Sequence, residues 1–145
     1  MIVGVGLDLV DVARVKRLIA SKQARALERL FTEGEVTYAM GRPEPYVHLA
    51  ARIAAKEAAY KALSGSPGAR GIGWREMEVV SRDGGAPSLL LHGSAEIRCA
   101  ELNVRRVWLT LSHSQMTAGA VVVLEGRGKG EAGREEGDSL GQLGR

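Results

Sequence analysis

The chain has little of what secreted, membrane-embedded and thiolate-metal proteins depend on. Its 145 residues include one cysteine, Cys99, which excludes an intrachain disulfide and a cysteine-based zinc site. No apolar run approaches the ~20 residues that a membrane-spanning helix needs. The apolar segment at the N-terminus has no basic residues before it, unlike a signal peptide. We therefore expect a cytoplasmic protein without membrane association.

Aromatic residues are also scarce, at 4% of the chain. Proteins that bind single-stranded nucleic acids stack bases on aromatic side chains, so the composition argues against that class. The net charge is +3. Basic residues are concentrated early in the chain: Arg14, Lys16, Arg17, Lys22, Arg25 and Arg29. Such a segment either binds an acidic partner or is a solvated helix face.

The length fits one domain, and the composition changes sharply near its end. Residues 126–145 contain seven glycines and almost no large apolar side chains. Such a segment cannot bury enough apolar surface to compensate for the entropy lost on ordering. We expect a folded domain over residues 1–125 and a disordered, charged tail over 126–145.

Hydrophobic periodicity and turn residues divide the folded part into short elements. We expect strands at 2–10, 77–81, 88–92, 107–112 and 118–125, and helices at 12–19, 24–30, 32–40, 46–63 and 95–102. The first strand is expected to be buried. Asp11, which follows it, fits the N-cap of the helix at 12–19. Thr32 and Glu35 have the spacing of a capping box. This order predicts an α+β fold with a small antiparallel sheet.

Helix 46–63 is unusual because seven of its residues are alanine. So many small side chains imply that another backbone approaches it closely. The same helix carries Arg52, Lys56, Glu57 and Lys61. Glu57 and Lys61 are four residues apart and share one helix face, which is also the spacing of an ordinary surface ion pair.

Asp8 lies inside the first apolar strand, where an unpaired carboxylate is costly. A structural role as a helix cap is less suitable for it than for Asp11. Asp8 and Glu57 together could provide two oxygen ligands for magnesium, which keeps several waters and is often completed by substrate phosphates. Lys61 and Arg52 would then face those phosphates.

Other familiar catalytic patterns are absent. Gly4 and Gly6 do not continue into a dinucleotide-binding fingerprint, and His113 is not preceded by a serine-hydrolase elbow. A histidine at a turn is more often structural than catalytic. The residues alone thus indicate a cation site that binds phosphates and do not define a reaction. A metal-dependent phosphohydrolase and a basic nucleic-acid-binding domain are two functions to be tested.

Three segments resemble one known family. They are residues 4–14 (GVGLDLVDVAR), 52–63 (RIAAKEAAYKAL) and 111–122 (LSHSQMTAGAVV). In this order and spacing they are similar to the motifs of the holo-acyl-carrier-protein synthases, the small phosphopantetheinyl transferases. The turn Gly85-Ala86-Pro87 also matches that family. Ile53 departs from it by standing where an aromatic residue is usual, and the loop at 64–70 is longer than the common one.

The resemblance implies transfer of the 4'-phosphopantetheine group of coenzyme A to a serine of apo-acyl carrier protein, for fatty acid biosynthesis. The other product is adenosine 3',5'-bisphosphate. By the same resemblance, Asp8 and Glu57 hold Mg²⁺ and Lys61 lies beside the phosphates. Arg52 and His113 line the coenzyme A site.

The resemblance also implies two macromolecular contacts. Arg14, Lys22 and Arg25 would face the acidic carrier protein. The chain would form a homotrimer with its active sites at the subunit interfaces, and no nucleic acid or membrane would be involved.

Overall fold

The computed structural model describes residues 1–64, 70–81 and 85–127. The predicted tail lies outside these residues from position 128 onward, and so does most of the loop at 64–70. None of the described helices is long and apolar enough to cross a membrane.

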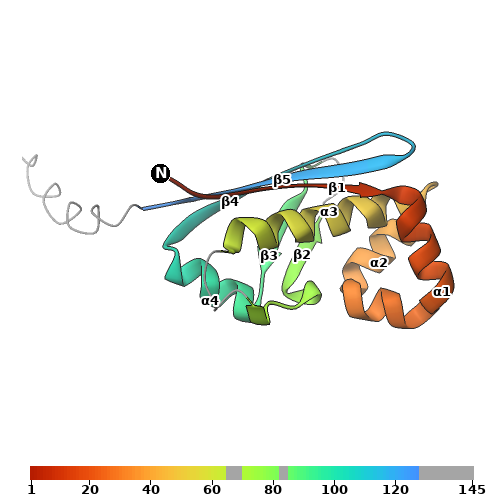
Figure 1. Ribbon diagram of the computed structural model, residues 1–145, viewed down its shortest axis with the longest axis horizontal. Coiled ribbons are helices and arrows are strands. Elements are labelled where there is room, and N and C mark those ends of the chain that lie inside the picture. The colour runs from red at the N-terminus through yellow and green to blue at the C-terminus, as the bar shows by residue number, and fades with distance from the viewer. Residues whose placement is uncertain (65–69, 82–84, 128–145) are drawn as a thin grey trace, which may run out of the picture.

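The elements follow the expected α+β order (Figure 1). They are β1 (Ile2–Asp11), α1 (Val12–Leu30), α2 (Glu33–Met40), α3 (Pro45–Leu63), the 3-10 helix η2 (Trp74–Glu76), β2 (Met77–Val80), β3 (Ser88–Leu91), α4 (Gly93–Glu101), β4 (Val104–His113) and β5 (Thr117–Gly126). The predicted break between the first two helices is wrong: α1 runs without interruption, since residues 20–23 contain neither glycine nor proline to stop it.

The two predicted helix caps have different outcomes. Thr32 and Glu35 form the complete capping box at the start of α2. Asp11 occupies the N-cap position of α1, but its side chain makes no capping hydrogen bond. Instead, the amide of Val12 donates to the carbonyl oxygen of Met116 at 2.9 Å. The loop between β4 and β5 therefore satisfies the first amide of the helix.

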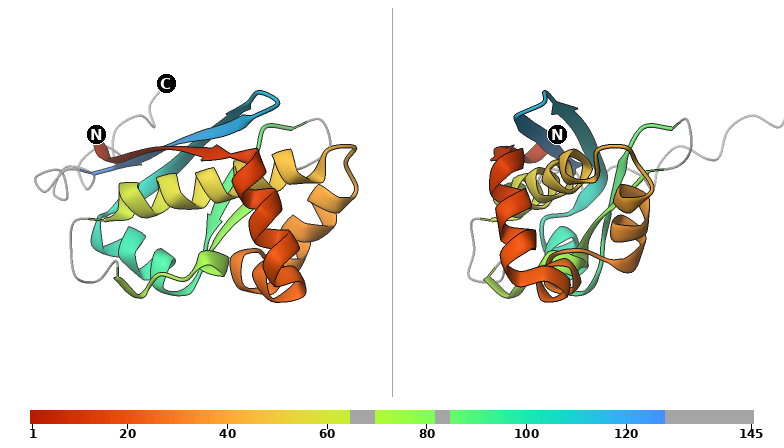
Figure 2. Two further views of the ribbon diagram at one scale, coloured as in Figure 1. Left: turned by 45° about the vertical axis from the view of Figure 1, so that its right-hand side comes forward. Right: turned by 90° about the vertical axis from the view of Figure 1, so that its right-hand side faces the viewer.

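The three strands β1, β5 and β4 form an antiparallel sheet in that order, and β2 pairs with β3 separately. Helix α3 lies along one face of the larger sheet, while α1, α2, α4 and the β2–β3 ribbon lie on the other side of α3 (Figures 1 and 2). Helix α3 is thus the central element, which explains why most of its residues are buried.

The alanines of α3 allow the close backbone approach that the sequence predicted. A Cβ atom on Gly6 would overlap the carbonyl oxygen of Ala58, and one on Gly4 would overlap that of Ala62. Both glycines belong to β1, so the strand lies directly on the helix backbone. This contact determines how far each later residue of β1 stands from α3.

The opposite face of the sheet is apolar and exposed, so the expectation of a fully buried first strand is wrong. Val5, Leu7 and Leu9 are 58–69% exposed, and Trp108 of β4 is 51% exposed. Successive residues of a strand face opposite sides, and α3 covers only one side. The described part of the chain leaves the other side uncovered.

Candidate active site

Alternation along β1 turns Asp8 toward α3. Gly6 and Asp8 lie on the same side of the strand, and Gly6 touches the helix backbone at Ala58. In the neighbouring strand β5, Asp8 is opposite Ala120, whose small side chain is buried. The sheet and helix therefore bring the Asp8 carboxylate to the helix face that carries Glu57 and Lys61.

Lys61 pairs with Asp8 across this contact. Its Nζ donates to Asp8 Oδ1 at 2.8 Å and to the carbonyl oxygen of Leu7 at 3.0 Å. The Asp8 side chain is 13% exposed, whereas that of Lys61 is 55% exposed. Asp8 Oδ2 is buried and has no hydrogen-bond partner in the described part of the chain. A buried carboxylate oxygen without a donor is costly and is available to a cation.

Glu57 lies beside Asp8, and the two carboxyl groups change each other's protonation. Burial, followed by the neighbouring Asp8, raises the pKa of Glu57 to about 7, against smaller effects of Arg14 and Lys61. Burial alone would raise the pKa of Asp8, but interactions with Glu57 and Lys61 hold that pKa below its usual value. Asp8 therefore loses its proton first, and Glu57 loses its proton only near pH 7, as is usual for close carboxyl groups.

These features fit a divalent cation with hard-oxygen preferences. Asp8 and Glu57 offer two facing carboxyl groups, and Asp8 Oδ2 has no other partner among the described residues. Over residues 1–64, 70–81 and 85–127, no group of three or more His, Cys, Asp and Glu side chains could hold a metal. A two-carboxylate site suits Mg²⁺, which takes its remaining ligands from water and phosphate.

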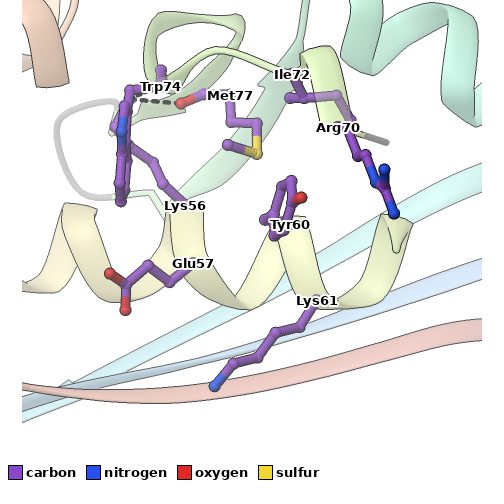
Figure 3. A pocket seen from close by; sticks show the side chains of 8 residues that line it. All are labelled: Lys56, Glu57, Tyr60, Lys61, Arg70, Ile72, Trp74 and Met77. Atoms are coloured by element: carbon purple, nitrogen blue, oxygen red, sulfur yellow. Dashed lines mark hydrogen bonds between the residues drawn. The ribbon is translucent and has the colours of Figure 1, made fainter. Parts of the chain in front are cut away.

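A cavity of about 450 Å³ opens beside these residues (Figure 3). Its lining combines charged and apolar side chains: Lys56, Glu57, Tyr60, Lys61, Arg70, Ile72, Trp74 and Met77. The volume is within the range of small-molecule sites, which are ~300–1,000 Å³. Lys61 and Arg70 suit phosphate groups, and the apolar wall suits an uncharged arm of the same ligand.

A second, smaller cavity of about 120 Å³ lies between α1 and α3. It shares Glu57 and Trp74 with the first cavity and is also lined by Arg14. Arg14 is therefore close enough to lower the pKa of Glu57. The start of α1 belongs to the site, whereas Lys22 and Arg25 are exposed farther along the same helix.

Arg52 does not line either of these cavities. Its guanidinium lies 4.3 Å over the ring of Tyr38 and donates to Ser81 Oγ at 3.2 Å. Arg52 is 2% exposed, and its Nε has no hydrogen-bond partner within the described residues. Two of the four charged residues that the sequence places on this helix are therefore buried, because Lys56 is completely buried as well.

His113 ends β4 and joins Arg52 in a second cluster. The His113 and His48 rings are 6.2 Å apart, and the His48 ring lies 5.8 Å from that of Tyr38. Burial, followed by the positive charges of Arg52, His113 and Arg42, lowers the pKa of His48. The structure thus groups Asp8, Glu57 and Lys61 in one cluster and Arg52 with His113 in another.

Five lining residues of the larger cavity were not expected from the sequence: Tyr60, Arg70, Ile72, Trp74 and Met77. Tyr60 could have been predicted from the sequence, because it lies one helical turn from Lys56 and Glu57. Arg70 and Trp74 follow a glycine-rich loop whose path the sequence does not determine. Their contribution to the site depends on how that loop returns to α3.

Comparisons with known proteins identify the family of the chain. The family model of the 4'-phosphopantetheinyl transferase superfamily matches residues 4–118. The chain is 49% identical over 131 residues to the holo-[acyl-carrier-protein] synthase of Anaeromyxobacter dehalogenans, covering 88% of this chain and 99% of the relative. It is 45% identical over 130 residues to the synthase of Thermus thermophilus, covering 90% and 98%.

Among solved structures, the fold is similar to that of a holo-(acyl-carrier-protein) synthase from Bacillus anthracis in complex with CoA (3',5'-ADP). The TM-score is 0.70 and the identity 32%, over 88% of this chain and 99% of the other. The synthase of Neisseria meningitidis is similar with a TM-score of 0.75 and 28% identity, over 86% and 99%. The family match covers most of the chain, and the chain therefore belongs to the 4'-phosphopantetheinyl transferase superfamily.

Proposed function

We propose that this chain transfers 4'-phosphopantetheine from coenzyme A to a serine of apo-acyl carrier protein and releases adenosine 3',5'-bisphosphate. The observation that carries the proposal is the placement of Asp8, Glu57 and Lys61 beside a cavity with cationic and apolar walls, with Asp8 Oδ2 lacking a partner among the described residues. The named relatives support it, and they do not favour a phosphohydrolase or a nucleic-acid-binding domain. The product would serve fatty acid biosynthesis.

Asp8 and Glu57 would hold Mg²⁺ at this site. When bound, the ion would act as a Lewis acid toward the pyrophosphate of coenzyme A. Glu57 has to give up its proton before both carboxylates can act as ligands. Lys61, with its ammonium group at Asp8, neutralises charge that develops on the phosphates. The serine proton needs an acceptor, and the two candidates are a metal-bound water and Glu57 acting through water, since Glu57 borders both cavities.

Coenzyme A would occupy the larger cavity and extend toward Arg52 and His113. The cluster around His48 gathers several cationic groups, and their mutual repulsion contributes to the lowered pKa of His48. An anionic group of the ligand would relieve that repulsion. We therefore assign Arg52 and His113 to the binding of coenzyme A rather than to the transfer step.

The carrier protein would dock on α1. Arg14, Lys22 and Arg25 are exposed, and at 100° per residue they fall within an arc of about 80° on the helix surface. Arg14 also lines the smaller cavity beside Glu57. An acidic carrier on this arc would thus present its serine next to the metal-binding carboxylates.

The exposed face of the β1–β5–β4 sheet would be the interface of a homotrimer. Contiguous exposed apolar surface of this kind marks interaction sites, and it is formed by Val5, Leu7, Leu9 and Trp108. Assembly would bring active sites to the subunit interfaces. We place the enzyme in the cytoplasm, in agreement with its single cysteine.

Intact mass spectrometry tests the reaction directly. The protein is incubated with coenzyme A, Mg²⁺ and an apo-acyl carrier protein, and the carrier is weighed. A gain of one phosphopantetheine group that a chelator abolishes confirms the proposal. Release of phosphopantetheine without a carrier would instead indicate a hydrolase, and no reaction together with tight RNA or DNA binding would indicate a nucleic-acid-binding domain.

A further inference from the structure

Lys56 is adjacent to the candidate ligand Glu57 in α3 but has a different environment. Its side chain is completely buried. Its Nζ donates to Glu35 Oε1 at 2.7 Å, to the carbonyl oxygen of Trp74 at 2.8 Å and to that of Met77 at 2.6 Å. The three donors of the ammonium group are therefore all used, and none is left for a ligand.

Glu35 extends this contact to two further segments. Its Oε1 accepts from the amide of Thr32 at 3.0 Å, and its Oε2 accepts from the amide of Val79 at 3.1 Å. The Glu35–Lys56 pair thus connects α2, α3, η2 and β2 through hydrogen bonds inside the core. Buried ion pairs are seldom more stabilising than apolar residues of similar volume, so stability alone does not account for it.

The carbonyl oxygens that Lys56 holds belong to residues of the cavity wall. Trp74 and Met77 line the larger cavity opposite Glu57, as Figure 3 shows, and Trp74 also lines the smaller one. Lys56 and Glu57 are consecutive on a rigid helix. One buried ammonium group therefore relates the position of the apolar wall to that of the metal-binding carboxylate.

We propose that Lys56 and Glu35 are positioning residues that set the width of the cavity between Glu57 and the wall formed by Trp74 and Met77. The inference rests on the proposed function, because the occupant of this space is taken to be the pantetheine arm of coenzyme A. Loss of the pair would release the wall and weaken contacts to the arm. The phosphates would keep their partners.

The proposal is tested by comparing the binding of coenzyme A with that of adenosine 3',5'-bisphosphate. The second ligand lacks the pantetheine arm and the phosphate attached to it. The Glu35→Gln/Lys56→Met double variant removes both charges and leaves a side-chain carbonyl oxygen at position 35 that can still accept from a backbone amide. Calorimetry with Mg²⁺ is expected to show coenzyme A binding weakened about tenfold, with adenosine 3',5'-bisphosphate binding unchanged. In a Trp108→Phe background, the emission of Trp74 should shift as well.

Arg98→Met is the matched control, because Arg98 is a buried cation that donates to the carbonyl oxygen of Leu63. It should lower thermal stability without changing the ratio of the two affinities. An unchanged ratio in the double variant would overturn the proposal. If the double variant does not fold, Glu35→Gln alone must show the same change of ratio to a smaller extent, and an unchanged ratio there would overturn it equally. Failure of the unaltered protein to bind either ligand would instead refute the proposed function.

Discussion

At the scale of single residues, the chemistry depends on two neighbouring carboxyl groups that lose their protons at different pH values. Interactions with Glu57 and then Lys61 lower the pKa of Asp8, whereas burial and the neighbouring Asp8 raise the pKa of Glu57 to about 7, so that Glu57 keeps its proton longer. A divalent cation would replace that proton. Metal binding should therefore release a proton, and it should be tighter above pH 7 than below it.

Asp8→Asn is expected to abolish magnesium binding and to lower kcat by a factor of at least ~100, because one charged ligand is lost. The variant should remain folded, since the side chain stays isosteric. Isothermal titration with Mg²⁺ and a carrier-modification assay measure the two effects. Full turnover in the variant would contradict the assignment of the metal site.

Glu57 should make the metal-free protein less stable as the pH rises. Its pKa is about 7 in the folded protein, against an ordinary 4.5. The stability from this group is complete below pH 4.5 and is lost as the pH approaches and passes 7. Between pH 5 and pH 8, the Tm of the unaltered protein should fall by about 2–4 °C more than that of Glu57→Gln. The lowered pKa of Asp8 acts only in more acidic solution. Equal Tm changes in the two proteins would show that Glu57 is not perturbed.

The sequence identified Asp8 and Glu57 as candidate ligands, but it could not show that they lie close together in the folded protein. Asp8 and Glu57 are distant in the chain, and their contact depends on β1 lying on α3. The burial of Arg52 and Lys56 was missed because their partners come from segments that spacing does not relate to α3: Ser81 for Arg52, and Glu35 and Trp74 for Lys56. From the sequence pattern alone, buried charges on an alanine-rich helix cannot be distinguished from exposed ones, because the burying segments are distant in the chain.

At the scale of elements, α3 and β1 form the framework on which the site is built. The glycines of β1 and the alanines of α3 bring the two backbones into contact. The alanine content predicted that another backbone lies close to α3, but it did not identify that backbone as β1. The continuity of α1 was not predictable, because a run of polar residues is compatible with both a helix and a loop.

Gly6→Ala should destabilise the protein by about 3 kcal/mol or more, since the added methyl group overlaps the carbonyl oxygen of Ala58. Gly34→Ala is the matched control. A Cβ there has ordinary contacts only, the nearest at 3.8 Å, so helix propensity should make that variant more stable by about 1 kcal/mol. Urea denaturation measures both. A mild effect at Gly6 would mean that β1 can move away from the helix.

Helix α1 predicts a difference between two basic residues. Arg25→Ala should raise the KM for the carrier protein several-fold and reduce its dependence on salt, with kcat unchanged. Arg14→Ala should also lower kcat, because Arg14 lies beside Glu57. Arg105→Ala, an exposed residue of β4, is the control and should change neither. Identical carrier kinetics in all three variants would place the docking surface elsewhere.

At the scale of the whole molecule, only one of the two faces of the larger sheet is covered by the described part of the chain. One face of the β1–β5–β4 sheet packs on α3, and the other exposes valine, leucine and tryptophan side chains. The apolar composition of β1 predicted burial, which the chain by itself does not provide. That composition could not show that the covering surface belongs to another copy of the chain, as we propose.

The Val5→Lys/Trp108→Ser double variant should be monomeric and should lose most of its activity, because the proposed sites lie between subunits. Size-exclusion chromatography with light scattering measures the mass in solution. Ile97→Lys, which replaces a 63% exposed residue of α4, is the control and should leave assembly intact. Trimers in the double variant would move the interface to another surface.

The glycines of β1 also decide which alignments of the strand on α3 are possible during folding. A slip by one residue would turn Val5 and Leu7 toward the helix, where the carbonyl oxygens of Ala58 and Ala62 leave no room for a side chain. A strand that is shifted by one residue therefore cannot pack against α3. Asp8 therefore faces inward for steric reasons, and the site can assemble correctly before metal or substrate is present.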